Sequence, residues 1–132
     1  MRSTRVHPST LSPGTVVSVP VFGLLSHVGI VSDRVGHDGC PMVISNSQRR
    51  RGGAEESWSD FTQGKEAKVE PLSSSLPWWE VLDRARSRLG RRWDLLVWNC
   101  EHFVRYSLGL EPKSPQLRAV AGAILVVVAL RL

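Results

Sequence analysis

A cysteine at the predicted start of a helix is the feature that most constrains how this chain can fold. Residues 93–98 form a mostly apolar run, and Asn99, which follows it, is a favoured N-cap because its side-chain oxygen can accept an unpaired backbone N–H. Cys100 would then be the first residue of the helix, where unpaired amides and the helix dipole favour a thiolate. Gly109 is the expected end of this helix. A thiol in this position is either a nucleophile or a small buried hydrophobic residue, which is the role of most free cysteines.

Segments rich in β-branched residues precede this helix and predict strands. The expected strands are 15–22, 26–32 and 42–46, with shorter ones within 55–61 and 67–70. Alternation in the second of these strands puts His27 and Val31 on one face and Val28 and Ile30 on the other. The second and third strands are expected to pair as a hairpin, because turn-forming residues separate them. A helix is predicted where apolar residues recur at helical spacing. This helix covers 77–89, with its apolar face formed by Trp78, Val81, Leu82, Ala85 and Leu89.

Residues 99–104, with the sequence Asn-Cys-Glu-His-Phe-Val, resemble the signature of the lecithin:retinol acyltransferase-like family. The family consists of thiol enzymes related to the NlpC-type cell-wall peptidases. In these enzymes the catalytic His precedes the Cys and lies on a strand, and residues 26–31, which contain His27, match that context. The resemblance covers roughly residues 14–112. It implies an α+β, permuted papain-like (NlpC-type) fold, in which a small antiparallel sheet packs against the helix bearing the nucleophilic Cys.

The resemblance implies that Cys100 is the nucleophile and His27 its base, although the two residues are 73 positions apart. Two alternatives remain open for the residue that orients the imidazole. The family commonly has a second His on the next strand; Ser45 stands at that position, and Asn46 would replace it if the register shifts by one residue. Neither stabilises an imidazolium as a charged partner would, so we expect a slower or differently tuned enzyme. His102 is expected to make a structural hydrogen bond. The other motif residues that support the site are Asn99, Glu101 and Phe103.

The Cys and His pair predicts chemistry at an acyl carbon. His27 would take the thiol proton and hold the thiolate as an ion pair, and attack on an ester, thioester or amide would give an acyl-cysteine. Water would complete a hydrolase reaction, whereas an amine or hydroxyl would complete an acyl transfer. The resemblance implies a lipid or another acyl-bearing small molecule as substrate, and no cofactor or metal is expected. The alternatives are a non-catalytic binding module of the same fold and a cell-wall peptidase-like amidase.

The charged and polar residues bear on the partners and the location of the protein. The net charge is +5, and the basic residues are scattered apart from 49–51 and the arginines between 84 and 92. No nucleic-acid-binding motif accompanies them, so no nucleic-acid partner is expected. Cys40 and Cys100 do not make a disulfide framework. Residues 1–13 are polar and lack the apolar core of a secretion signal, which favours a cytoplasmic location.

The chain of 132 residues is expected to form one domain with two flanking segments. These are a loose polar N-terminal segment (1–13), a lecithin:retinol acyltransferase-like domain (14–112), and a linker with an apolar C-terminal helix (113–132). Residues 119–130 have no polar side chain, but as a helix they would be only about 18 Å long, against about 30 Å for a bilayer core. This helix is expected either to contact a membrane surface or to pack on the domain or on a second copy, and the oligomeric state stays open.

Overall fold

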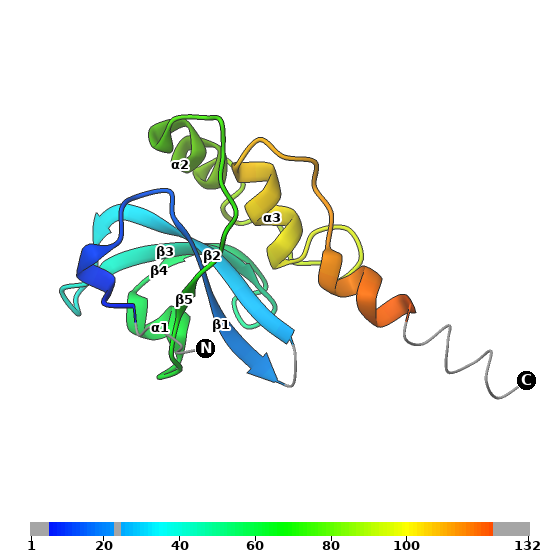
Figure 1. Cartoon of the computed structure of the whole chain (residues 1–132), viewed down its shortest axis with the longest axis horizontal. Coiled ribbons are helices and arrows are strands. Elements are labelled where there is room, and N and C mark those ends of the chain that lie inside the picture. The colour runs from blue at the N-terminus through cyan, green and yellow to red at the C-terminus, as the bar shows by residue number, and fades with distance from the viewer. Residues whose placement is uncertain (1–5, 23–24, 123–132) are drawn as a thin grey trace, which may run out of the picture.

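A computed structural model of the protein describes residues 6–22 and 25–122. In this part of the chain, five antiparallel strands form one sheet in the order β4-β3-β2-β1-β5 (Figure 1). The strands are β1 (Val16–Phe22), β2 (Leu25–Val35), β3 (Pro41–Ser47), β4 (Gly52–Glu56) and β5 (Lys68–Val69). The helices are η1 (Pro8–Thr10), α1 (Trp58–Thr62), α2 (Trp78–Arg86) and α3 (Cys100–Ser107), and residues 115–122 are also helical. The predicted α+β class and the antiparallel sheet are therefore confirmed.

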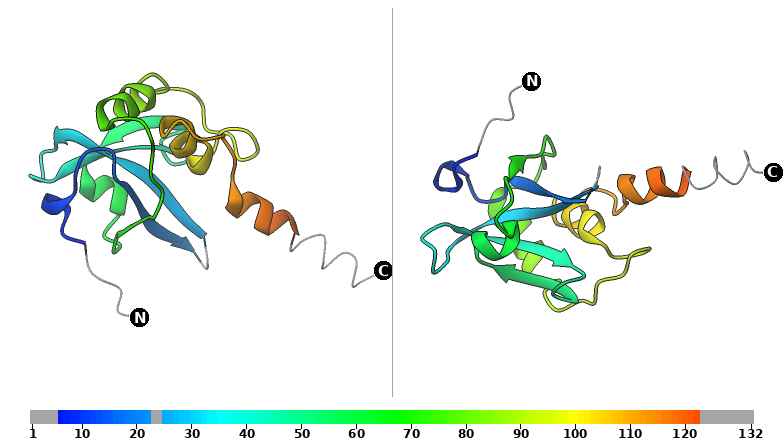
Figure 2. Two further views of the ribbon diagram at one scale, coloured as in Figure 1. Left: turned by 45° about the horizontal axis from the view of Figure 1, so that its top comes forward. Right: turned by 90° about the horizontal axis from the view of Figure 1, so that it is seen from below.

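Helices cover both faces of the sheet, and the alternation of side chains along β2 separates the two layers. Helices α2 and α3 lie together over one face, and α1 lies on the other (Figures 1 and 2). Val28 and Ile30 pack with the buried residues of α2 and α3, whereas Val31 packs with Phe61 of α1. Since successive side chains of a strand point to opposite faces, His27 belongs to the face that carries α1.

A gap between β2 and β3 opens at one end of the sheet. The two strands pair from Gly29 and Ser45 onward, and among the described residues the part of β2 before Gly29 pairs with β1 only. The Val31 N–H donates to the residue just before β1. Because backbone groups of an antiparallel strand point alternately to its two neighbours, those of Ser26 and Val28 point toward β3. The groups of Ser26 lie beyond the last described pair of the β2–β3 ladder and therefore face the gap.

The observed elements agree in most places with those predicted from the sequence, and they differ around residues 52–62. The predicted hairpin of the second and third strands is present as β2 and β3. The helix predicted over 77–89 is present as α2 but ends at Arg86, and Trp78 and Leu89 of its predicted apolar face are exposed. The strand expected within 55–61 is wrong, because this segment holds the end of β4 and the helix α1. Ser57 caps α1 by accepting the Asp60 N–H at 3.1 Å. A helix this short has no apolar periodicity, so only its cap could have indicated it.

The predicted location, cytoplasmic with a membrane contact through residues 119–130, is not upheld. Residues 119–122 belong to the helical segment that begins at 115, and the rest of the predicted membrane contact lies outside the described residues. Within the described ranges, every helix is too short or too polar to cross a bilayer. The helical segment 115–122 is only about 12 Å long.

Candidate active site

Helix α3 begins at Cys100 with a complete capping box. Asn99 Oδ1 accepts the backbone N–H of Glu101 at 2.9 Å and that of His102 at 3.2 Å. His102 Nδ1 accepts the Asn99 N–H at 2.9 Å, which closes the box. Burial lowers the pKa of His102, so its ring is neutral and Nδ1 is free to accept this bond. The motif therefore fixes the backbone on both sides of Cys100.

Asn46, a fully buried residue of β3, joins the sheet to the segment before Cys100. Its Nδ2 donates to the Trp98 carbonyl at 2.6 Å and to the Asn99 carbonyl at 3.3 Å. Its Oδ1 has no hydrogen-bond partner among the described residues. Asn46 therefore lies on the face that carries α3 and fixes the start of that helix.

The Cys100 thiol lies against strand β2. The residue packs on the apolar cluster that contains Val28 and Phe103, and it retains partial solvent exposure. Burial raises the pKa of the thiol to about 11; hydrogen bonding with the backbone of Val28 opposes the rise, and the Glu101 carboxylate adds to it. This result contradicts the expected thiolate. The loss of solvation outweighs the favourable field at the helix N-terminus.

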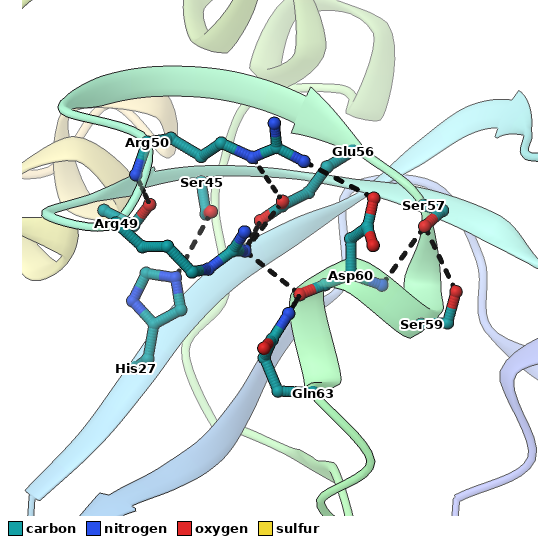
Figure 3. Close-up of polar contacts among 10 residues, drawn as sticks. His27, Ser45, Arg49, Arg50, Glu56, Ser57, Ser59, Asp60 and Gln63 are labelled. Carbon is teal, nitrogen blue, oxygen red and sulfur yellow. Dashed lines mark hydrogen bonds and ion pairs between the residues drawn. The ribbon is translucent and has the colours of Figure 1, made fainter.

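His27 lies on the other face of the sheet and contacts Ser45. Its Nε2 is 3.3 Å from Ser45 Oγ (Figure 3), and Nδ1 makes no hydrogen bond within the described part of the chain. The ring packs on Phe61, with the ring centroids 5.3 Å apart. Burial lowers the pKa of His27 to about 4, and the positive charges of Arg49 and Lys65 add to the effect. The imidazole is therefore neutral at neutral pH.

A buried carboxylate holds Arg49 beside the imidazole (Figure 3). Glu56 is 4% exposed and accepts from Arg49 Nη2 at 2.8 Å and from Arg50 Nε at 3.0 Å. Arg49 also donates to the Asp60 carbonyl at 3.0 Å. The sequence showed residues 49–51 only as a basic stretch, since these contacts depend on how the β3–β4 hairpin and α1 come together. The acidic groups here are bound to guanidinium groups, and no described cluster of His, Cys, Asp and Glu side chains could hold a metal ion.

His27 and Cys100 approach the gap between β2 and β3 from opposite faces. The imidazole extends toward β3 through its bond to Ser45, and the thiol meets the backbone of Val28, the residue after His27. Among the described residues, no hydrogen bond joins the imidazole to the thiol. Of the two candidate orienting residues, Ser45 contacts the imidazole, whereas Asn46 contacts the backbone before Cys100. The site thus consists of two halves that border one gap.

The turn before α3 presents exposed apolar side chains three to five residues before Cys100 in the chain. Asp94 Oδ1 accepts two backbone N–H groups of the turn, and Asp94 pairs with Trp98 to close it. The large apolar side chains of residues 95–97 are each more than half exposed. An apolar surface therefore lies within five residues of the candidate nucleophile in the chain.

Comparison with protein families gives a match that includes both halves of the site. A family model described as lecithin retinol acyltransferase matches residues 11–109, well over half of the chain. This stretch contains His27, Ser45 and Cys100 together with all strands of the described sheet. A comparison with curated proteins finds no match.

Proposed function

The chain belongs to the lecithin retinol acyltransferase family, and on this basis we propose that it is a thiol acyltransferase or hydrolase with Cys100 as nucleophile and His27 as general base. The proposal includes the permuted papain-like arrangement, in which the start of the nucleophile helix meets the strand that carries the base. One observation carries it. The thiol at the capped start of α3 contacts the backbone of Val28, one residue from His27.

In this proposal the base acts from its neutral form. A thiol with a pKa of about 11 and an imidazole with a pKa of about 4 favour a neutral resting pair over an ion pair. Ser45 engages Nε2 of His27, so Nδ1 is the nitrogen that accepts the thiol proton across the gap. This transfer requires the imidazole to turn toward the thiol at the end of the β2–β3 ladder.

The covalent step follows from these roles. The sulfur bonds to the acyl carbon as its proton passes to His27, and the resulting oxyanion collapses with loss of an alcohol or amine, which takes the proton from the imidazolium. The Cys100 N–H lies in the first turn of α3, where no intrahelical acceptor exists, and it can donate to the oxyanion. Water, or an acceptor hydroxyl or amine, then takes the acyl group by the same steps in reverse.

The proposed substrate is a lipid or another acyl-bearing small molecule. The exposed apolar side chains of residues 95–97 support this choice, because they could contact an acyl chain whose carbonyl lies at Cys100. Whether water or another acceptor completes the reaction depends on which molecule occupies the acceptor position.

The proposal is tested by trapping the acyl-cysteine. The protein is mixed with p-nitrophenyl butyrate, and the adduct is measured by intact mass and located by peptide mapping. We expect one adduct on Cys100, none in Cys100→Ala, and formation slowed by roughly a hundredfold or more in His27→Ala. Cys40→Ala is the matched control and should acylate as the wild type does. Acylation of Cys40 alone, or of neither cysteine, would refute the proposal.

The second candidate is a binding module of the same fold without turnover. It is favoured by the raised pKa of the Cys100 thiol and by the absence, among the described residues, of a hydrogen bond from this thiol to His27. It predicts that an uncleavable acyl analogue, such as a long-chain alkyl ether, binds the protein although no acyl-cysteine forms. Isothermal titration calorimetry with the ether measures this binding, and the two candidates are distinguished by whether the acylation experiment gives an adduct on Cys100.

A further inference from the structure

Gln116 gives strand β2 the backbone contacts that a neighbouring strand would otherwise supply. Its Oε1 accepts the Ser26 N–H at 2.8 Å, and its Nε2 donates to the Ser26 carbonyl at 2.9 Å. These two backbone groups face the gap, where β3 no longer pairs with β2. The side-chain amide therefore satisfies both of them. Because Ser26 directly precedes His27, this contact holds the strand at the candidate base.

The same segment also binds the start of α3. Glu101 Oε1 accepts from the Ser114 hydroxyl at 2.6 Å and from the backbone N–H of Gln116 at 2.9 Å. Ser114 is 4% exposed, and its Oγ also accepts the Leu117 N–H at 3.2 Å, so it caps the helical segment 115–122. Because Glu101 directly follows Cys100, these contacts hold the helix at the candidate nucleophile.

Together these contacts join strand β2, helix α3 and the segment around Gln116 to one another beside the gap. Ser26 and Val28 both direct backbone groups toward β3, about 7 Å apart along the strand. Gln116 forms hydrogen bonds with the backbone N–H and carbonyl of Ser26, and the Cys100 thiol forms a hydrogen bond with the backbone of Val28. Glu101 then links the helix back to Gln116.

We propose that Ser114 and Gln116 are positioning residues, which clamp β2 to α3 and thereby set the separation of His27 and Cys100. Both lie beyond residue 109, outside the stretch that the family model matches, so the clamp belongs to the C-terminal part of this chain. Its role in catalysis rests on the proposed function, but its effect on the thiol does not. Release of the clamp frees the thiol from Val28 and admits water, whereas the approach of His27 to Cys100 becomes less well defined.

The test compares Gln116→Ala with Arg118→Ala, an exposed neighbour in the same helical segment, in the full-length protein. Two rates are measured at mildly alkaline pH: iodoacetamide alkylation of each cysteine, and acylation by p-nitrophenyl butyrate over a range of concentrations. For Gln116→Ala we expect Cys100 alkylation to rise several-fold, because the thiol becomes better solvated. The maximal acylation rate should fall on the order of tenfold, with the half-saturating ester concentration unchanged. Alkylation of Cys40 and all rates of Arg118→Ala should match the wild type.

Hydrogen exchange at the Ser26 amide gives a direct check, since this N–H donates to Gln116 and should lose protection in Gln116→Ala. Wild-type rates for Cys100 in Gln116→Ala, with the Ser26 amide deprotected, would overturn the clamp. If Gln116→Ala fails to fold, Ser114→Ala is measured in the same way, because it removes the hydroxyl bond to Glu101 and leaves the Ser26 contacts in place. Unchanged rates in that variant also overturn the proposal. A wild type without acylation would instead refute the proposed function, and the alkylation rate would still test the clamp.

Discussion

At the scale of single residues, both groups of the proposed catalytic pair are shifted toward their neutral forms. His27 is neutral above a pKa of about 4, and Cys100 stays protonated below a pKa of about 11. A neutral base that accepts a thiol proton during attack needs both of these forms, and both are populated throughout this interval. In thiol enzymes with a preformed thiolate–imidazolium pair, by contrast, the rate rises with pH as the thiol loses its proton and the ion pair forms.

The pH dependence of acylation follows from these values. We expect the acylation rate constant, corrected for hydrolysis of the ester, to be flat between about pH 5 and pH 9 and to fall in acid only near the lowered pKa of His27. On the acid side, the loss comes from protonation of His27, which removes the base. The measurement is a pH profile of single-turnover acylation. An acid limb near the ordinary pKa of 6.5 would contradict the burial of the imidazole.

Arg49 provides a second test of the same residue. Burial is the main cause of the lowered His27 pKa, and the charge of Arg49 adds to it. Arg49→Gln should therefore raise the pKa of His27 and move the acid limb to higher pH. Arg50→Gln is the matched control, because Arg50 also binds Glu56 but is not among the charges that act on His27. The pKa is read from the imidazole resonances by NMR titration, and equal shifts in the two variants would contradict the role of Arg49.

Ser45 and Asn46 are adjacent in β3 but lie on opposite faces of the sheet. Their substitutions should therefore affect different properties, acylation for Ser45 and stability for Asn46. Ser45→Ala removes one hydrogen bond to His27, and acylation should slow about five- to tenfold with little change in stability. Asn46→Ala leaves the buried carbonyls of Trp98 and Asn99 without this donor, and the free energy of unfolding should fall by about 1–3 kcal/mol. Chemical denaturation and acylation of both variants check this. The reverse pattern would mean that Asn46 orients the imidazole.

At the scale of secondary-structure elements, local sequence signals predicted much of the fold. The β-branched runs predicted β1, β2 and β3, the apolar periodicity predicted α2, and Asn99 predicted the start of α3. Alternation along β2 also predicted that His27 and Val28 face opposite sides. The sequence could not show which face α3 covers, because that depends on packing between distant segments. For the same reason it did not indicate the contacts of Arg49 or Gln116.

Gly29 is an element-scale test, because it allows β2 and β3 to pack closely against α1. A Cβ at this position would lie 2.6 Å from Val43 Cγ1 and 2.9 Å from Phe61 Cε2. Gly29→Ala should lower the free energy of unfolding by about 1–3 kcal/mol, the usual cost of overpacking a core. It should also displace Phe61 from the His27 ring. Gly122→Ala is the control, since a Cβ there meets no described atom within 4 Å. Equal stability of the two variants by denaturation would contradict this packing.

At the scale of the whole molecule, each face of the sheet is joined to its helices by an ionic cluster. On one side Glu56 of β4 binds Arg49 and Arg50, close to α1. A second cluster joins α2 to β4 and to β2. In it Arg86 Nη2 contacts Glu55 at 3.0 Å and Asp33 at 2.6 Å. Since the Glu55 side chain is 7% exposed, the second cluster resembles a buried pair more than a surface one.

Removal of the Arg86 side chain should therefore lower the free energy of unfolding more than removal of a surface arginine does. Burial alone would raise the pKa of Glu55, but the hydrogen bonds from Arg86 and Ser32 outweigh it, so the pKa is lowered. The stability that this interaction of Glu55 contributes is present above the unfolded-state pKa of Glu55 and is lost as the pH falls through the lowered value.

Arg86→Ala leaves the carboxylate buried with a weaker set of partners, and should lower the free energy of unfolding at neutral pH by about 3 kcal/mol. The difference from the wild type should shrink in acid, where Glu55 is protonated. Glu55→Gln in the Arg86→Ala background removes the uncompensated charge and should recover part of the loss; denaturation curves that show no recovery would mean that Arg86 acts through packing alone.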